Sequence, residues 1–191
     1  AIEFMNEERS GPWLMSVNTF DPHPAYGASA SLVANIDPDT MPGPLFKDSD
    51  LEIQAKLSSH IFQKKPQPPD QTQPQRTANY YAMIELIDQN VGRLLDELEQ
   101  TNQRKNTVII FMSDHGQLLG DHGLENKGCR FYEGLVRVPL IISWPGNFEL
   151  GLRSDGLVEL TDIAPTLCDI VDIDPGWTHG QSLLPILTGQ S

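Results

Sequence analysis

Residues 77–112 combine a long amphipathic helix pattern with a short apolar strand pattern. Apolar side chains recur every three or four residues along the helical part, which predicts one continuous stripe. The stripe comprises Tyr80, Ile84, Ile87, Val91, Leu94, Leu95 and Leu98. The apolar run from Val108 to Met112 then predicts a strand that is covered on both faces. A helix followed by a buried strand indicates an α/β fold, with a mostly parallel sheet flanked by helices.

Shorter elements are predicted on either side of this pair. Strand patterns occur at residues 13–20, 138–144 and 157–160, and helix patterns at residues 1–9, 50–62 and 161–171. Residues 26–76 are rich in Ala, Ser, Gly, Pro and Gln, which predicts a loop-rich insertion. Within it, Ser49 and Glu52 form a capping-box signature at the start of the 50–62 helix.

Composition limits the classes of partner. The net charge of −13 over 191 residues argues against nucleic acid, which requires a basic face. No apolar run approaches the roughly 18–20 residues that span a bilayer, so no membrane partner is expected. An anionic substrate stays compatible, because a metal ion and a few cations can reverse the local field. Cys129 and Cys168 form no Cys-x-x-Cys pattern, which indicates neither a zinc site nor a disulfide framework.

The predicted strand at residues 108–112 ends in a polar corner, Ser113-Asp114-His115-Gly116. Ligands of open α/β sheets collect at the carboxyl ends of strands. A carboxylate from Asp114 and an imidazole from His115 could hold a divalent metal ion there. Alternatively, Asp114 caps a turn and His115 is its polar neighbour. A second triplet, Asp121-His122-Gly123, lies in a glycine-flanked loop, so its spacing does not predict a binuclear site.

Two further side chains suit an anionic ester. Lys127 lies in a polar, glycine-flanked segment, and its ammonium group suits the oxygens of a tetrahedral anion. His23 lies between Pro22 and Pro24, which fix the backbone around it. Alternatively, Lys127 is a solvated surface lysine, and His23 is a turn residue without a functional role. Glu133 and Arg137 are four residues apart, which predicts a structural ion pair.

Together these motifs resemble the sulfatase family, which belongs to the alkaline-phosphatase-like superfamily of metal-dependent hydrolases. The resemblance rests on motif order and on the spacing of 13 between Asp114 and Lys127; the matching segments are residues 113–116, 120–122, 127, 132–133, 137–142 and 180–187. It implies an alkaline-phosphatase-like three-layer fold. It also implies that residues 1–191 are an incomplete sulfatase catalytic domain, its C-terminal portion.

The resemblance assigns roles to particular residues. Asp114 and His115 would ligate a divalent metal ion, Ca²⁺ in the first place, with Mg²⁺ and Mn²⁺ as alternatives. His23 and Lys127 would be catalytic and bind the substrate, and His122 would contribute to substrate binding. The expected substrate is a small sulfate ester or a sulfated glycan.

The family's nucleophile is a formylglycine made from a Cys or Ser in a Cys-x-Pro/Ala-x-Arg motif, which neither Cys129 nor Cys168 matches. We therefore expect this motif in a preceding part and no turnover from residues 1–191 alone. The sequence shows no signal peptide and leaves the compartment open, with the periplasm and the extracellular space both compatible. A phosphonate monoester or phosphodiester hydrolase is the alternative enzyme. A non-catalytic fragment that self-associates through exposed strand edges is the alternative of another class.

Overall fold

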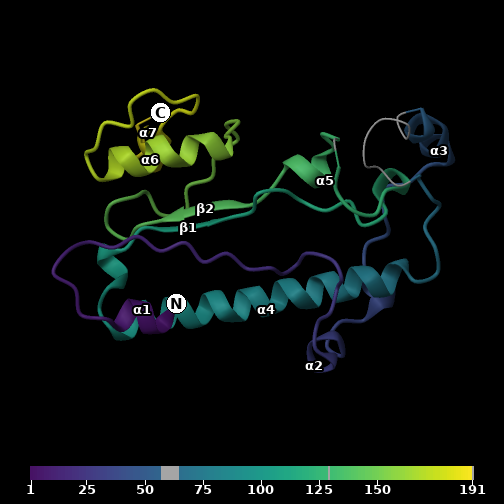
Figure 1. Ribbon diagram of the computed structural model, residues 1–191, viewed down its shortest axis with the longest axis horizontal. Helices are drawn as coiled ribbons and strands as arrows, with labels where there is room; N and C mark the ends of the chain where they lie inside the picture. Colours follow the sequence, from purple (N-terminus) through teal and green to yellow (C-terminus); the bar gives the residue numbers. More distant parts are fainter. Residues whose placement is uncertain (57–64, 129, 191) are drawn as a thin grey trace. The chain divides into compact units, whose positions relative to one another are not determined.

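The computed structural model describes residues 1–56, 65–128 and 130–190, and the chain divides into two compact units (Figure 1). The first unit comprises Ala1–Thr101 and His115–Val138, and the second comprises Asn102–Asp114 and Pro139–Ser191. Among the described residues, no helix is both long and apolar enough to cross a membrane.

The helices of the first unit are α1 (Ile2–Asn6), α2 (Ala30–Val33), α3 (Asp48–Ala55), α4 (Gln73–Gln100) and α5 (Glu133–Val136), with the 3-10 turns η1 (Pro38–Thr40) and η3 (Asp121–Gly123). The second unit contains the strands β1 (Ile109–Met112) and β2 (Leu140–Ser143), the helices α6 (Ile163–Ile170) and α7 (Leu184–Leu187), and the 3-10 turns η2 (Arg104–Asn106) and η4 (Leu160–Asp162).

Helix α4 is the longest element and confirms the helix predicted from the apolar stripe. It begins earlier than predicted, at Gln73, and its first half buries small and polar residues as well as Met83. Ile84, in the predicted stripe, is 41% exposed, whereas Ala78 and Ala82 are completely buried. Near its other end, α1 lies beside α4, and Asn6 Nδ2 donates to Glu97 Oε1 at 2.8 Å (Figure 1).

The predicted insertion at residues 26–76 is loop-rich and contains α2, η1 and α3. Helix α3 begins at Asp48, and the predicted capping box at Ser49 and Glu52 is wrong. Instead, Asp50 Oδ2 accepts from the backbone N–H of Lys47 at 2.9 Å, which caps the helix two residues earlier. The rest of the helix predicted at 50–62 lies outside the described residues after Lys56.

The sheet differs from the predicted one. β1 and β2 pair in antiparallel, with Phe111 opposite Ile141 and Met112 opposite Leu140. The chain between them contains η3 and the four-residue α5 and, among its described residues, no long crossover helix of the kind that usually joins parallel neighbours. The prediction that β1 is buried on both faces is also wrong in this structure, because Phe111 is 36% and Met112 48% exposed.

Two other predicted strands are absent from the described structure. Residues 13–20 have strand composition, yet no strand pairs with them, and Leu14 and Phe20 are 75% and 72% exposed. Strand composition produces a strand only where a neighbour takes the backbone hydrogen bonds. Residues 157–160 are exposed as well, and their last residue already begins η4.

The C-terminal segment of the second unit is organised around Asp162, which is 8% exposed. Its two carboxylate oxygens accept from the backbone N–H groups of Glu159 and Gln181, both at 2.8 Å. Thr166, at 0% exposure, extends this network, because its hydroxyl donates to the Asp162 carbonyl and accepts from the Leu183 N–H. The turn at residues 180–187 is therefore fixed to α6, the confirmed helix of the 161–171 pattern.

Candidate functional site

Residues 116–126 form a loop whose two arms are joined like those of a hairpin; we call it the 116–126 loop. Three backbone hydrogen bonds join the arms, Leu118 N–Asn126 O at 3.2 Å, Leu119 N–Glu125 O at 3.2 Å and Gly120 N–Leu124 O at 2.8 Å. His115 directly precedes the outgoing arm, and Lys127 directly follows the returning arm. The bonds between the arms therefore bring His115 and Lys127 close together at the base of the loop.

A small apolar core supports the 116–126 loop. Leu118, Leu124 and Leu135 are 1%, 4% and 5% exposed and pack together, with the ring of Tyr132 against them. The N–H of Gly116 donates to the carbonyl of Leu135 at 2.8 Å. A Cβ atom at Gly116 would lie 2.0 Å from the carbonyl oxygen of Gly134, so this approach requires glycine.

The structure brings two predicted site residues, His115 and Lys127, together. Lys127 Nζ lies 2.9 Å from His115 Nε2. The other ring nitrogen, Nδ1, lies 2.7 Å from the carbonyl oxygen of Gly116. A carbonyl only accepts, so Nδ1 carries the proton and Nε2 presents the lone pair. His115 is thus fixed as the tautomer whose lone pair faces Lys127.

The two predicted metal ligands, Asp114 and His115, are consecutive in the chain but belong to different units. Asp114 is exposed and follows β1 after Ser113, whereas His115 is half-buried and opens the second segment of the first unit. Among the residues that the structure describes, no three His, Cys, Asp or Glu side chains gather as a metal cluster. Metal ligation by Asp114 and His115 stays a prediction.

His23 is exposed, in the proline-flanked corner where the sequence places it. Its Nδ1 lies 2.7 Å from the carbonyl oxygen of Pro24, and its ring lies 5.1 Å from that of Phe20. Three residues on, the Tyr26 hydroxyl accepts from Gln117 Nε2 at 2.6 Å, which ties this corner to the 116–126 loop. Burial raises the pKa of Tyr26, the Gln117 hydrogen bond lowers it, and Glu125 raises it further. The catalytic role of His23 stays a prediction.

His122 is held by ring stacking and by a contact with a carboxylate. Its ring stacks on Tyr132 with centroids 3.9 Å apart, and its Nδ1 lies 3.5 Å from Asp50 Oδ1. The adjacent Asp121 Oδ1 accepts from the Leu45 N–H at 2.7 Å. The second Asp-His-Gly triplet therefore fixes the insertion to the 116–126 loop, and substrate binding by His122 stays a prediction.

Sequence reasoning missed the polar residues that surround this loop. They are Tyr26, Gln54, Gln73, Arg76 and Arg130. Gln54 is completely buried; its Oε1 accepts from Arg130 Nε at 2.9 Å and its Nε2 donates to the Tyr132 hydroxyl. No local pattern identifies such residues, because their partners are distant in sequence. The predicted Glu133–Arg137 ion pair is confirmed at 3.8 Å, on the surface.

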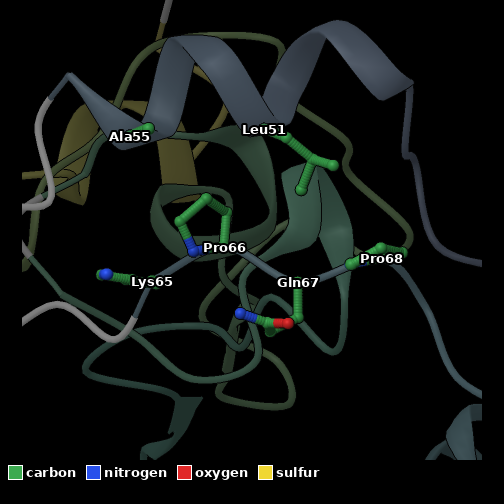
Figure 2. A pocket seen from close by; sticks show the side chains of 6 residues that line it. All are labelled: Leu51, Ala55, Lys65, Pro66, Gln67 and Pro68. Carbon is green, nitrogen blue, oxygen red and sulfur yellow. The ribbon is translucent and has the colours of Figure 1, made fainter.

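A shallow groove of about 420 Å³ lies between α3 and the proline-rich segment that follows it (Figure 2). Leu51 and Ala55 line it from the helix, and Lys65, Pro66, Gln67 and Pro68 from the segment. None of the predicted site residues lines this groove. It is a largely apolar surface feature, separate from the contact between His115 and Lys127.

Comparison with known proteins gives a consistent family. The family model described as Sulfatase matches residues 1–173. A choline-sulfatase of Rhizobium meliloti (strain 1021) is 34% identical over 194 residues, which cover 96% of this chain and 37% of the relative. An N-acetylglucosamine-6-O-sulfatase of Bacteroides thetaiotaomicron is 39% identical over 114 residues, which cover 59% of this chain and 20% of the relative. The chain thus spans less than two fifths of the length of either relative.

The fold agrees with this family. The crystal structure of a phosphonate monoester hydrolase of Agrobacterium radiobacter superposes with a TM-score of 0.88 at 27% identity, over 100% of this chain and 41% of that one. The match of the family model to most of the chain decides the assignment. The chain belongs to the sulfatase family, within the alkaline-phosphatase-like superfamily.

Proposed function

We propose that the protein containing this chain is a metal-dependent sulfuric ester hydrolase. Asp114 and His115 ligate a divalent metal ion, and Lys127 and His23 contact the transferred sulfate group and the leaving oxygen. The observation that carries this proposal is the contact between His115 Nε2 and Lys127 Nζ within a matched sulfatase sequence. It gathers a neutral nitrogen ligand and a cation at one place, which is what an anionic ester and a metal ion require.

The chemistry of the donor set fits a metal ion. The hydrogen bond from His115 Nδ1 to the Gly116 carbonyl directs the Nε2 lone pair, as is usual for ligating histidines. Because Nε2 has one lone pair, a metal ion and Lys127 Nζ compete for it. With His115 holding the metal ion, Lys127 would be placed to donate to an anionic oxygen of the substrate.

The metal ion would supply positive charge for the nucleophile and the sulfate oxygens. We propose Ca²⁺ in the first place, by family resemblance, with Mg²⁺ and Mn²⁺ as alternatives, because an imidazole ligand favours borderline metals over Ca²⁺. The nucleophile is proposed to be a formylglycine, whose motif does not occur in residues 1–191.

The substrate is proposed to be a small sulfate ester or a sulfated sugar. The name of one relative refers to choline sulfate, and that of another to the 6-O-sulfate of N-acetylglucosamine. Both substrates share the sulfate monoester group that Lys127 and His23 would contact. They differ in the alcohol, which other parts of the pocket must recognise.

A phosphonate monoester or phosphodiester hydrolase is the second candidate. The specific observation in its favour is the TM-score of 0.88 with a phosphonate monoester hydrolase over the whole chain. Sulfate and phosphonate monoesters both present a tetrahedral, singly charged group with anionic oxygens to a lysine. The two activities therefore cannot be separated by Lys127 and need a direct comparison of substrates.

The test compares kcat/KM of the full-length natural protein on p-nitrophenyl sulfate and on p-nitrophenyl phenylphosphonate. We expect the sulfate ester to be preferred, with activity lost on chelation and restored by a divalent metal ion. Lys127→Ala should lower kcat/KM for the preferred ester by 100-fold or more. Lys105→Ala is the matched control, because Lys105 lies in the other unit at η2. A preference for the phosphonate would move the assignment to the second candidate, and no turnover of either ester would refute both.

A separate assay of residues 1–191 alone tests the proposal that the nucleophile lies outside this chain. We expect no turnover of either ester by this chain. A saturable, metal-dependent rate from it would show that the chain carries a nucleophile of its own. If the chain is instead a self-associating module, its mass in light scattering should rise with concentration.

A further inference from the structure

The first turn of α4 contacts both arms of the 116–126 loop. Gln73 is 3% exposed, and its Nε2 donates to the carbonyl oxygen of Leu119 on the outgoing arm. Arg76, one turn along the helix, forms an ion pair of 3.3 Å with Glu125 on the returning arm. The same helical turn therefore reaches one residue of each arm, at the pair that the Leu119 N–Glu125 O hydrogen bond joins.

The two side chains also fix each other. Arg76 Nη2 donates to Gln73 Oε1 at 2.5 Å, which leaves the Gln73 amide nitrogen to face Leu119. Arg76 Nη1 in turn donates to Asp70 and to the Thr72 hydroxyl, at 3.2 and 2.6 Å. At the turn of the loop, Gly120 allows the close approach, because a Cβ there would lie 3.1 Å from the Gln73 amide.

We propose that Gln73 and Arg76 are positioning residues that hold the two arms at the spacing at which His115 and Lys127 meet. The effect of this positioning on the reaction rests on the proposed function, whereas the positioning itself does not. His115 precedes the outgoing arm and Lys127 follows the returning arm, two residues beyond Glu125. A change in arm spacing or register at Leu119 and Glu125 is therefore transmitted to the contact between Nε2 and Nζ.

Gln73 should carry more of this role than Arg76. Loss of the Gln73 amide leaves the part-buried carbonyl of Leu119 without its hydrogen-bond donor, which is costly. The Arg76–Glu125 pair is partly exposed, with side chains 29% and 46% accessible, and such pairs contribute little by themselves. Arg76 acts mainly by orienting the amide of Gln73.

The experiment replaces Gln73 by Leu, which keeps the volume and removes the donor. Gln75→Leu is the matched control, because it is the same substitution in the same helical turn. Gln75 is exposed, and its side chain donates a hydrogen bond to Asn79. Displacement of a reacting group by about 1 Å can cost roughly 100-fold. We expect Gln73→Leu to lower kcat/KM of the full-length protein by 10- to 100-fold per folded enzyme, and Gln75→Leu to stay within twofold.

A second readout does not depend on catalysis. In the metal-free protein, the two imidazole nitrogens of His115 should give well-separated ¹⁵N signals, because one tautomer is fixed. Gln73→Leu should move these signals toward each other, and Gln75→Leu should not. Unchanged His115 signals together with unchanged kcat/KM in a folded Gln73→Leu variant would overturn the inference.

If Gln73→Leu does not fold, Arg76→Gln tests the positioning of His115 instead. Arg93→Gln on the same helix is its control. Arg93 is exposed and donates to Asn90 Oδ1, away from the loop. A shift of the His115 signals in Arg76→Gln but not in Arg93→Gln supports the inference. His115 signals that are unchanged from wild type in both Arg76→Gln and Arg93→Gln refute it. If the wild-type protein hydrolyses no ester while Gln73→Leu still shifts His115, the proposed function fails and the positioning of His115 stands.

Discussion

Gly116→Ala should break the base of the 116–126 loop. The added Cβ would lie 2.0 Å from the Gly134 carbonyl oxygen, whereas ordinary contacts begin at 3.4 Å, so the chains must separate by roughly 1.4 Å. That separation lengthens the Gly116 N–Leu135 O hydrogen bond, which is 2.8 Å long, to at most about 4.2 Å and so weakens or breaks it. It also loosens Leu135 from Leu118 and Leu124.

The lost hydrogen bond and the disturbed packing together should lower the free energy of unfolding by about 2–4 kcal/mol. Urea unfolding followed by circular dichroism measures this, with the slope of the transition checked for constancy. Gly43→Ala is the control, because a Cβ there meets nothing within 4 Å and should change stability by less than about 0.5 kcal/mol. Equal stability of the two variants would refute the close approach of residues 116 and 134.

Three further substitutions test the fold at separate places. Asp162→Ala should cost about 3–5 kcal/mol in urea unfolding, since it leaves two N–H groups without the carboxylate that is 8% exposed; a loss below about 1 kcal/mol would contradict the network. Gly92 lies in the interior of α4, and a Cβ added there meets nothing within 4 Å. Gly92→Ala should therefore raise the unfolding free energy by about 0.5–1 kcal/mol, and a decrease would contradict the open space at this position. Glu133→Gln should change it by less than about 0.5 kcal/mol, because both partners of its ion pair are at least 80% exposed.

Local pattern predicted the elements whose signal lies within one segment. Helix α4, the strand positions of β1 and β2, and α6 follow from periodicity and from apolar runs. Strand direction and pairing depend on segments far apart in the chain. This is why the predicted parallel sheet is not confirmed and residues 13–20 are not a strand.

The candidate site divides in the same way. Motif order predicted His115 and Lys127 as partners in one site, and the hydrogen bonds between the arms of the 116–126 loop bring the two residues together. Gln54 and Gln73 were not predictable, because an isolated glutamine has no signature and the partners Arg130 and Leu119 are 46 or more residues away. Buried amides of this kind emerge only from tertiary packing.

Titration of the metal-free, full-length protein with Ca²⁺, Mg²⁺ and Mn²⁺ tests the central claim most directly. We expect binding of at least one ion to weaken 100-fold or more in Asp114→Ala and in His115→Ala, since each removes a direct ligand, with a change below twofold in His179→Ala. His179 packs beside Trp177 in the second unit and has no predicted metal role. Metal affinity that is unchanged in both Asp114→Ala and His115→Ala would contradict the metal site and the hydrolase mechanism built on it.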